Sequence, residues 1–174
     1  MTPRIRRGLP ADAPSLAKLA ERTFRETYGA FNSPQDIAHY VAGHFGPDRQ
    51  AVELADEATV TLVAEADGTA AGYAQLRWSD PPGCVAGPTP MEVSRFYVDG
   101  PWQGRGLAQG LMAATVDAAR IEGARTLWLG VWERNARAIA FYTKCGFREA
   151  GTQTFVLGAD RQRDLVLVRS QSPA

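Results

Sequence analysis

Hydrophobic residues in the first third of the chain recur with the period of an α-helix. From Leu16 to Thr27 they stand at i, i+3 and i+4 spacing, which predicts an amphipathic helix over residues 12–28. Asp12 is expected to cap the N-terminus of this helix, and Gly29 is expected to end it.

Beyond this helix the pattern shifts toward the two-residue period of strands. A second helix is first expected between the Ser-Pro pair at 33–34 and the Gly-Pro pair at 46–47. Asp67-Gly68 then predicts a hairpin, and the proline-rich residues 79–90 predict a long loop. The expected strands cover residues 3–7, 59–66, 70–78, 91–98, 126–132, 147–157 and 162–169, and two further helices cover residues 106–122 and 135–145.

The order of these elements defines the fold class. Helices come first, then a meander, then a strand–helix–strand–helix unit, then a terminal hairpin. This order predicts an α/β (α+β) fold, with a mixed central sheet of about seven strands flanked by about four helices. The chain of 174 residues has the length of one domain, which is expected to span residues 1–174.

Composition and charge exclude several classes of protein. The 19 Lys and Arg residues balance 19 Asp and Glu residues, unlike the basic excess of a nucleic-acid binder. No apolar run approaches the roughly 20 residues of a membrane helix, and the charged N-terminus has no apolar stretch behind it, so no signal peptide is expected. Cys84 and Cys145 form no CxxC pair, which favours free thiols in a cytoplasmic protein. His39 and His44 miss the i, i+4 spacing, so no metal site is expected.

The most informative segment lies between Val98 and Ala108, where glycines join an expected strand to an expected helix. Gly104 and Gly106 would let backbone N–H groups approach an anion, and the helix N-terminus adds a partial positive charge. The segment is therefore either a phosphate or pyrophosphate site or a tight turn without a ligand. It lacks a Gly-Lys-Ser/Thr ending, and Gly110 comes one position too late for GxGxxG, so neither a Walker loop nor a Rossmann fingerprint fits.

Two motifs in the second half of the chain carry a family resemblance. The run from Gln103 to Ala108 fits Q/R-x-x-G-x-G/A, and the run from Asn135 to Phe147 fits N-x-x-A-x-x-F-Y-x-K-x-G-F. In this order they resemble the GNAT family, the Gcn5-related N-acetyltransferases, over roughly residues 1–170. A closer similarity is to the PaiA-type spermidine/spermine N-acetyltransferases; it rests on residues 23–28, 32–34, 129–133 and 155–158.

The resemblance implies a GNAT acyl-CoA N-acyltransferase fold and a reaction. The acetyl group of acetyl-CoA, the co-substrate, would pass to a primary amine by direct attack in a ternary complex. The turn would hold the pyrophosphate. The pantetheine arm would follow the strand that precedes the turn, at the place where this strand splays from the strand at 127–132. An amide near Val98 would face the thioester oxygen. The residues assigned to acetyl-CoA are Phe96, Tyr97, Val98, Gln103, Gly104, Arg105, Gly106, Leu107, Ala108, Asn135, Arg137 and Lys144, with Lys144 for the 3′-phosphate.

Tyr142 is the residue expected to protonate the departing thiolate. It shares a helical face with Asn135, and a phenol with a pKa of about 10 can share its proton with an alkyl thiolate. The alternative is an aromatic residue that only packs. Glu92 is the first candidate for the base that deprotonates the amine, because its offset from Gln103 matches a general-base glutamate in the histone acetyltransferase branch. Glu133 and a water chain are the alternatives.

The acceptor is expected near the junction of the first two helices. Tyr28, Phe31 and Tyr40 would form an aromatic wall suited to a cationic small-molecule amine such as a polyamine, with Glu133 nearby, unless they only pack in the core. The loop at 79–90 offers only Asp80 as an acid, so a peptide, amino-acid or antibiotic amine is an alternative acceptor. A non-catalytic CoA-binding regulatory module is the alternative outside enzymes. The resemblance also allows a homodimer, for which the sequence shows no interface.

Overall fold

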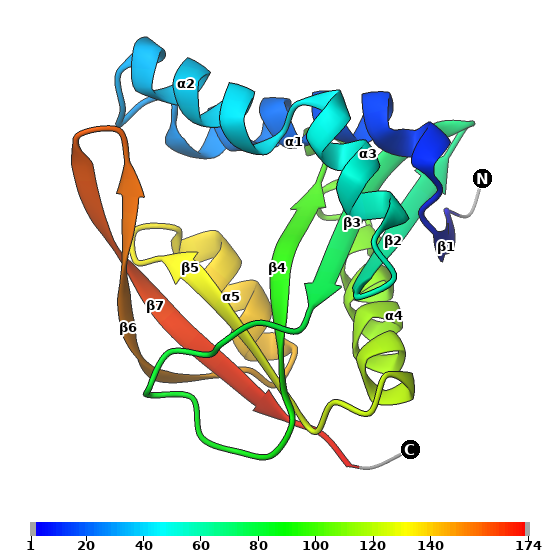
Figure 1. Ribbon diagram of the computed structural model, residues 1–174, viewed down its shortest axis with the longest axis vertical. Helices are drawn as coiled ribbons and strands as arrows, with labels where there is room; N and C mark the ends of the chain where they lie inside the picture. Colours follow the sequence, from blue (N-terminus) through cyan, green and yellow to red (C-terminus); the bar gives the residue numbers. More distant parts are fainter. Residues whose placement is uncertain (1–2, 173–174) are drawn as a thin grey trace.

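A computed structural model describes residues 3–172 of the chain, which form one mixed seven-stranded sheet with helices on both faces (Figure 1). The strand order is β1-β2-β3-β4-β5-β7-β6, and only the β4–β5 pair is parallel. The strands are β1 (Arg4–Arg7), β2 (Thr59–Ala66), β3 (Thr69–Arg77), β4 (Pro90–Val98), β5 (Thr126–Trp132), β6 (Arg148–Leu157) and β7 (Asp160–Ser170). The expected fold class is confirmed.

The two faces of the sheet carry separate hydrophobic cores. The core under α4 and α5 contains residues such as Leu111, Leu129 and Tyr142, and the core under α1 and α2 contains Leu16 and Tyr73. Because both faces are covered, the central strands read as nearly continuous apolar runs rather than as alternating ones. The helices are α1 (Ala13–Tyr28), α2 (Pro34–His44), α3 (Pro47–Ala55), α4 (Leu107–Ile121) and α5 (Ala136–Lys144).

The first part of the chain departs from the expectation in two places. α2 ends before the Gly-Pro pair at 46–47, as expected, but Pro47 then begins a helix that was not expected, α3, because a missing N–H costs nothing in a first turn. Asp12 precedes α1 but makes no capping bond to it; its carboxylate instead accepts hydrogen bonds from the Leu9 amide at 2.8 Å and from the Arg6 guanidinium at 2.7 and 2.9 Å. Asp12 is thus the N-cap residue of α1, as expected, but its side chain links β1 to the turn before the helix instead of capping it.

The parallel pair at the centre of the sheet is incomplete, and this creates the site. β4 and β5 pair only from Pro90 opposite Thr126 to Glu92 opposite Trp128. A register shift follows in β4, where Leu76 of β3 faces Val93 while Gln75 faces Arg95. Bulges of this kind bend a strand and end its pairing. The remaining lengths of β4 and β5 therefore diverge as a wedge, as the resemblance implied.

None of the helices within residues 3–172 combines the length and the apolar composition needed to cross a membrane.

Candidate active site

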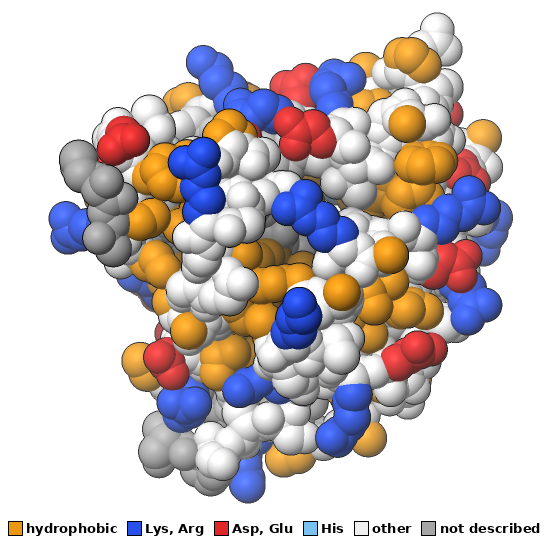
Figure 2. Space-filling model, turned by 180° about the vertical axis from the view of Figure 1, so that it is seen from behind, with side chains coloured by type: hydrophobic (Ala, Val, Ile, Leu, Met, Phe, Trp, Pro, Cys, Tyr) orange, Lys and Arg blue, Asp and Glu red, His pale blue; other side chains and the backbone are white. Residues whose placement is uncertain are grey.

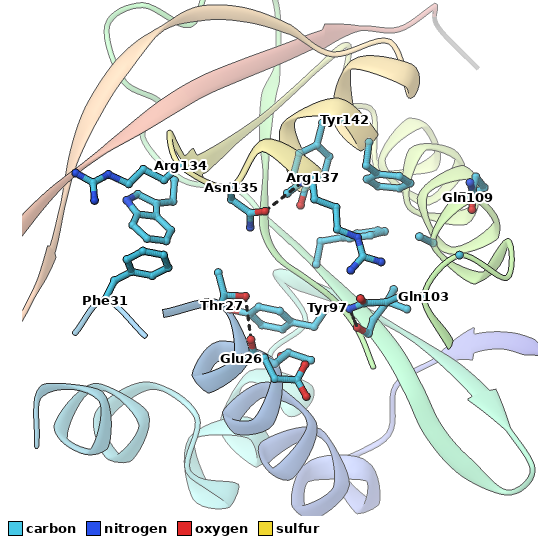
Figure 3. A pocket seen from close by; sticks show the side chains of 18 residues that line it. Glu26, Thr27, Phe31, Tyr97, Gln103, Gln109, Arg134, Asn135, Arg137 and Tyr142 are labelled. Carbon is cyan, nitrogen blue, oxygen red and sulfur yellow. Dashed lines mark hydrogen bonds between the residues drawn. The ribbon is translucent and has the colours of Figure 1, made fainter. Parts of the chain in front are cut away.

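A cavity of about 580 Å³ occupies the wedge between β4 and β5. Seen from behind, this side of the molecule is a hollow with a hydrophobic floor and Lys and Arg side chains around it (Figure 2). The wall residues come from α1, β4, the glycine-rich turn, α4, the end of β5 and α5 (Figure 3). They are Thr23, Glu26, Thr27, Phe31, Phe96, Tyr97, Val98, Gln103, Gly104, Ala108, Gln109, Trp132, Arg134, Asn135, Arg137, Ala138, Phe141 and Tyr142.

The glycine-rich turn needs its glycines for backbone reasons. Gly104 and Gly106 have φ of +76° and +83°, in the left-handed region, and a Cβ on either would meet nothing within 4 Å. Gly106 is the N-cap of α4, so the first amides of that helix have no intrahelical acceptor and point out of its N-terminus. The Gln103 side-chain amide donates to the Val98 carbonyl at 2.8 Å, which ties the turn to the end of β4. The result is an open cradle of N–H groups at one end of the cavity.

Most residues expected to hold the co-substrate line this cavity, but four do not. The ones that do are Phe96, Tyr97, Val98, Gln103, Gly104, Ala108, Asn135 and Arg137. Leu107 is buried in the core beneath α4, and Arg105 turns its guanidinium over the Trp102 ring, 5.8 Å from the centroid. Gly106 is not a wall residue and contributes only its backbone conformation to the turn. Lys144 is exposed at the far end of α5, and seven residues of helix place it about 10 Å along the axis from Arg137.

The N-terminus of α5 supplies charge to the cavity wall. The Asn135 side chain caps the helix by accepting from the Ala138 amide at 3.1 Å. Arg137, two residues further, points from α5 into the cavity toward Gln103 (Figure 3). Arg134 also lies on the wall, on the side of Phe31 and away from Gln103 (Figure 3). Lys144, expected to meet an anion, is not a wall residue, whereas Arg137 brings a positive charge to the turn.

Tyr142 is buried on the cavity wall, with 8% of its surface exposed. Its ring packs among Phe96, Phe141 and Phe147, with centroid separations of 6.1, 5.4 and 5.8 Å. Burial raises the pKa of the phenol well above its usual value near 10. The hydroxyl therefore stays protonated at neutral pH and can donate a hydrogen bond.

The two carboxylates considered as bases lie outside the cavity. Glu92 sits where β4 and β5 are still paired, and its Oε2 accepts from Arg77 at 2.7 Å and from Ser79 at 2.8 Å. Glu133 pairs with Arg163 at 3.5 Å beyond the end of β5. Neither belongs to the cavity wall. The expectation that Glu92 is the base is therefore not supported. Its carboxylate lies outside the cavity wall and is held by neighbours on β3 and in the following loop.

The expected aromatic wall is built, but only one of its three residues reaches the cavity. Phe31 lines it, is 58% exposed and packs on Trp132 with centroids 5.0 Å apart. Tyr28 lies behind, 5.2 Å from Trp132, and Tyr40 stacks on Phe24 at 4.7 Å. Tyr28 and Tyr40 are therefore packing residues that shape the wall rather than surfaces of the cavity itself.

Sequence reasoning also left several wall residues unnamed. Thr23, Glu26 and Thr27 stand at i, i+3 and i+4 on α1, so a stripe of polar side chains on one face of that helix was the available signal. Phe141 and Ala138 lie inside the second motif. Trp132 lies in the run 129–133 that carries the closer similarity, but that run did not mark it as a wall residue. Gln109 had no local signal, because its place on the wall depends on how α4 is packed.

Comparisons with known proteins agree with this geometry. The model of the acetyltransferase (GNAT) family matches residues 15–147. An uncharacterized N-acetyltransferase of Mycobacterium bovis is 37% identical over 158 residues, covering 91% of this chain and 97% of the relative. One from Lactobacillus delbrueckii subsp. lactis is 33% identical over 159 residues, covering 91% and 92%. The crystal structure of the PaiA N-acetyltransferase from Thermoplasma acidophilum in complex with coenzyme A superimposes with a TM-score of 0.83 at 19% identity, covering 98% of this chain and 100% of that one, a likeness of fold.

Proposed function

This chain belongs to the acetyltransferase (GNAT) family, and we propose that it acetylates a primary amine of a small cationic acceptor, with polyamines such as spermidine and spermine as the first candidates. Membership makes it an N-acetyltransferase with acetyl-CoA as its co-substrate. We propose the roles of the individual residues and the class of the acceptor.

The residues of the cavity fit acetyl-CoA. The cradle at Gly104 and Gly106 offers backbone N–H groups at a helix N-terminus, which suits the pyrophosphate. Arg137 points toward Gln103 and adds a positive charge near this cradle (Figure 3). The edge of β4 beyond Glu92 has no β5 partner, so its backbone groups are available to an extended pantetheine arm. Acetyl-CoA supplies the activated acetyl thioester.

One observation carries the proposed chemistry: the same cavity joins the N–H cradle to the buried hydroxyl of Tyr142. As the amine attacks, a C–N bond forms and the C–S bond breaks. The Tyr142 phenol donates to the sulfur that leaves, and the proton that the nitrogen sheds as the amide forms restores the phenol. Backbone amides near Val98 are suited to the charge on the thioester oxygen. The products are the N-acetylated amine and the free thiol.

The acceptor ammonium must lose a proton before it can attack, because its pKa is near 10. With Glu92 held by Arg77 and with Glu133 outside the cavity wall, we assign this proton to water in the open cavity. The rate is then expected to rise with pH over the range in which the amine, rather than a carboxylate, titrates.

Aromatic side chains at the α1 end of the cavity support a cationic acceptor. Trp132 and Phe31 present rings there, with Tyr28 behind them, and Glu26 adds a carboxylate on the same wall. Aromatic faces and carboxylates both favour alkylammonium groups.

A thiol-release assay with acetyl-CoA and a panel of amines tests the proposal. The panel holds spermidine, spermine, putrescine, n-butylamine, an aminoglycoside and a peptide with a free N-terminus. The proposal expects the highest kcat/KM with the polyamines and diamine. Preference for the peptide or the aminoglycoside would overturn the acceptor class. Binding of acetyl-CoA without turnover of any amine would favour a regulatory module instead.

A further inference from the structure

Asp164 of β7 is a buried carboxylate for which the chemistry above has no use. The residue is only 7% exposed, and its Oδ1 atom is buried without a hydrogen-bond partner among residues 3–172. Burial raises the pKa of this carboxyl to about 6. A carboxylate in such a position lowers stability unless it gains a partner, so its retention calls for an explanation.

The strand register places Asp164 directly beside the acceptor end of the cavity. It pairs with Trp132 of β5 on one side and with Gln153 of β6 on the other. Residues paired across neighbouring strands point to the same face of a sheet. The face in question is the one under α1 and α2, because Trp132 contacts Tyr28 and Phe31 there. Trp132 is also a cavity wall residue, so Asp164 lies immediately next to that wall.

Aromatic rings lie on the strands on either side of this carboxylate. The ring of Tyr28 lies 5.2 Å from Trp132 and 6.1 Å from Phe155, so it bridges the strands on either side of Asp164. Burial is the main reason that the pKa of Tyr28 and of Tyr40 is raised, and the negative charge of Asp164 raises both further. Rings that flank a carboxylate form the setting in which an alkylammonium group is bound by ion pairing and cation–π contact together.

A glycine brings two polar side chains together beside the cavity wall. Gly130 of β5 is exposed, and it points to the same face as Trp132, two residues on. A Cβ at this position would lie 3.2 Å from Asp164 Oδ2 and 2.5 Å from Gln153 Nε2. The Asp164 carboxylate and the flexible end of Gln153 therefore lie over the backbone of this exposed glycine, which only a residue without a side chain permits. We call the cluster of Asp164, Gln153 and Gly130 the Asp164 niche.

We propose that the Asp164 niche binds a second ammonium group of the acceptor, so that the enzyme selects diamines and polyamines over monoamines. The inference rests on the proposed function, because it assumes that the first amine is the one acetylated. The Asp164 carboxylate makes an ion pair with the distal ammonium, and Tyr28 and Trp132 enclose its methylene chain. Asp164 is then a specificity-determining residue and not the base.

The test compares Asp164→Asn with the parent protein on putrescine and on n-butylamine, which have the same carbon chain but differ by one ammonium group. We expect the KM for putrescine to rise about tenfold to hundredfold, the range for loss of one charge-assisted hydrogen bond. The kcat for putrescine and both constants for n-butylamine should change less than about twofold. Asp117→Asn, the same change at an exposed residue of α4, is the matched control and should alter nothing.

A second variant guards against a folding defect. Gly130→Ala crowds Asp164 Oδ2 without changing the charge, and the Gln153 amide that it must displace is the end of a flexible side chain. It should raise the KM for putrescine and spare n-butylamine in the same way. Equal losses on both amines, or a fall in kcat with unchanged KM, would overturn the inference, since they indicate a proton-transfer or structural role.

A binding measurement separates this inference from the proposed function. Calorimetry of putrescine with protein saturated by CoA needs no turnover. If the parent protein turns over no amine, the proposed function fails, yet weaker putrescine binding in Asp164→Asn still supports the niche. If amines are acetylated but Asp164→Asn binds putrescine as tightly as the parent, the niche is refuted while the function stands.

Discussion

Replacing Tyr142 by phenylalanine removes one oxygen atom from the cavity wall and leaves the packing of the ring intact. None of the hydrogen bonds within residues 3–172 uses this hydroxyl as donor or acceptor, and the hydroxyl is not a buried unpaired group. Its removal therefore leaves no partner unsatisfied. The free energy of unfolding should change by less than about 1 kcal/mol, so any large change in rate reflects the chemical step.

The expected loss of rate follows from the surroundings of the phenol. General acids contribute roughly 10²- to 10⁴-fold. Burial holds the pKa of Tyr142 well above 10, whereas a thiol titrates near about 8.5. A donor so much less acidic than the leaving group stabilises the sulfur by hydrogen bonding more than by full proton transfer. We therefore expect the low end of the range, a fall in kcat of about 100-fold, or about 2.7 kcal/mol.

The assay is thiol release at saturating amine, with kcat and the KM for acetyl-CoA measured separately. The KM should stay within about threefold, because the proposed phosphate site lies at the other end of the cavity. In the parent protein no loss of activity from titration of this acid is expected below pH 10, because the phenol remains protonated there. Tyr73→Phe, which removes a buried hydroxyl bonded to Gln50 at 3.4 Å in the other core, is the matched control. A folded Tyr142→Phe protein with kcat within threefold of the parent would refute the acid role.

Three further changes probe the turn, the excluded base and the buried carboxylate. Gly106→Ala forces a residue with a Cβ into the left-handed region. Thermal melts should show a loss of about 1–2 kcal/mol in stability, and kinetics should show a higher KM for acetyl-CoA. An unchanged KM would argue against the cradle. Glu92→Gln should leave kcat and its pH profile within about twofold, because the carboxylate is bound to Arg77 outside the cavity; a collapse of kcat would restore the base role. Between about pH 4 and 6, Asp164 is protonated in the folded protein but ionised in the unfolded chain. The parent therefore loses stability as the pH rises through this window. Asp164→Asn should gain on the parent by up to about 3 kcal/mol between pH 4 and 7 in urea melts; a difference independent of pH would contradict the buried charge.

Local signals in the sequence were read correctly where short-range physics sets the structure. The left-handed conformations at Gly104 and Gly106, the cap at Asn135 and the helix that carries Tyr142 each depend on a few neighbouring residues. The helix that begins at Pro47 was missed because the same residue that cannot continue one helix is well suited to begin the next.

Residues whose roles depend on partners from distant parts of the chain were misread or missed. Glu92 is spaced correctly for a base, but its partner Arg77 lies on the neighbouring strand. Lys144 matches its motif, but helix geometry carries it away from the cavity. Asp164 looks like a polar residue in a terminal strand until the register sets it between Trp132 and Gln153.

The sequence by itself determined the family, the order of the elements, the glycine-rich cradle and the place of Tyr142, because these rest on local periodicity, backbone conformation and motif spacing. Only the tertiary structure decided where β4 and β5 part, which side chains face the wedge, and that a carboxylate of β7 is buried beside the acceptor wall. The physical reason is that strand register and burial come from contacts between segments far apart in the chain, and no local pattern records how such segments are aligned.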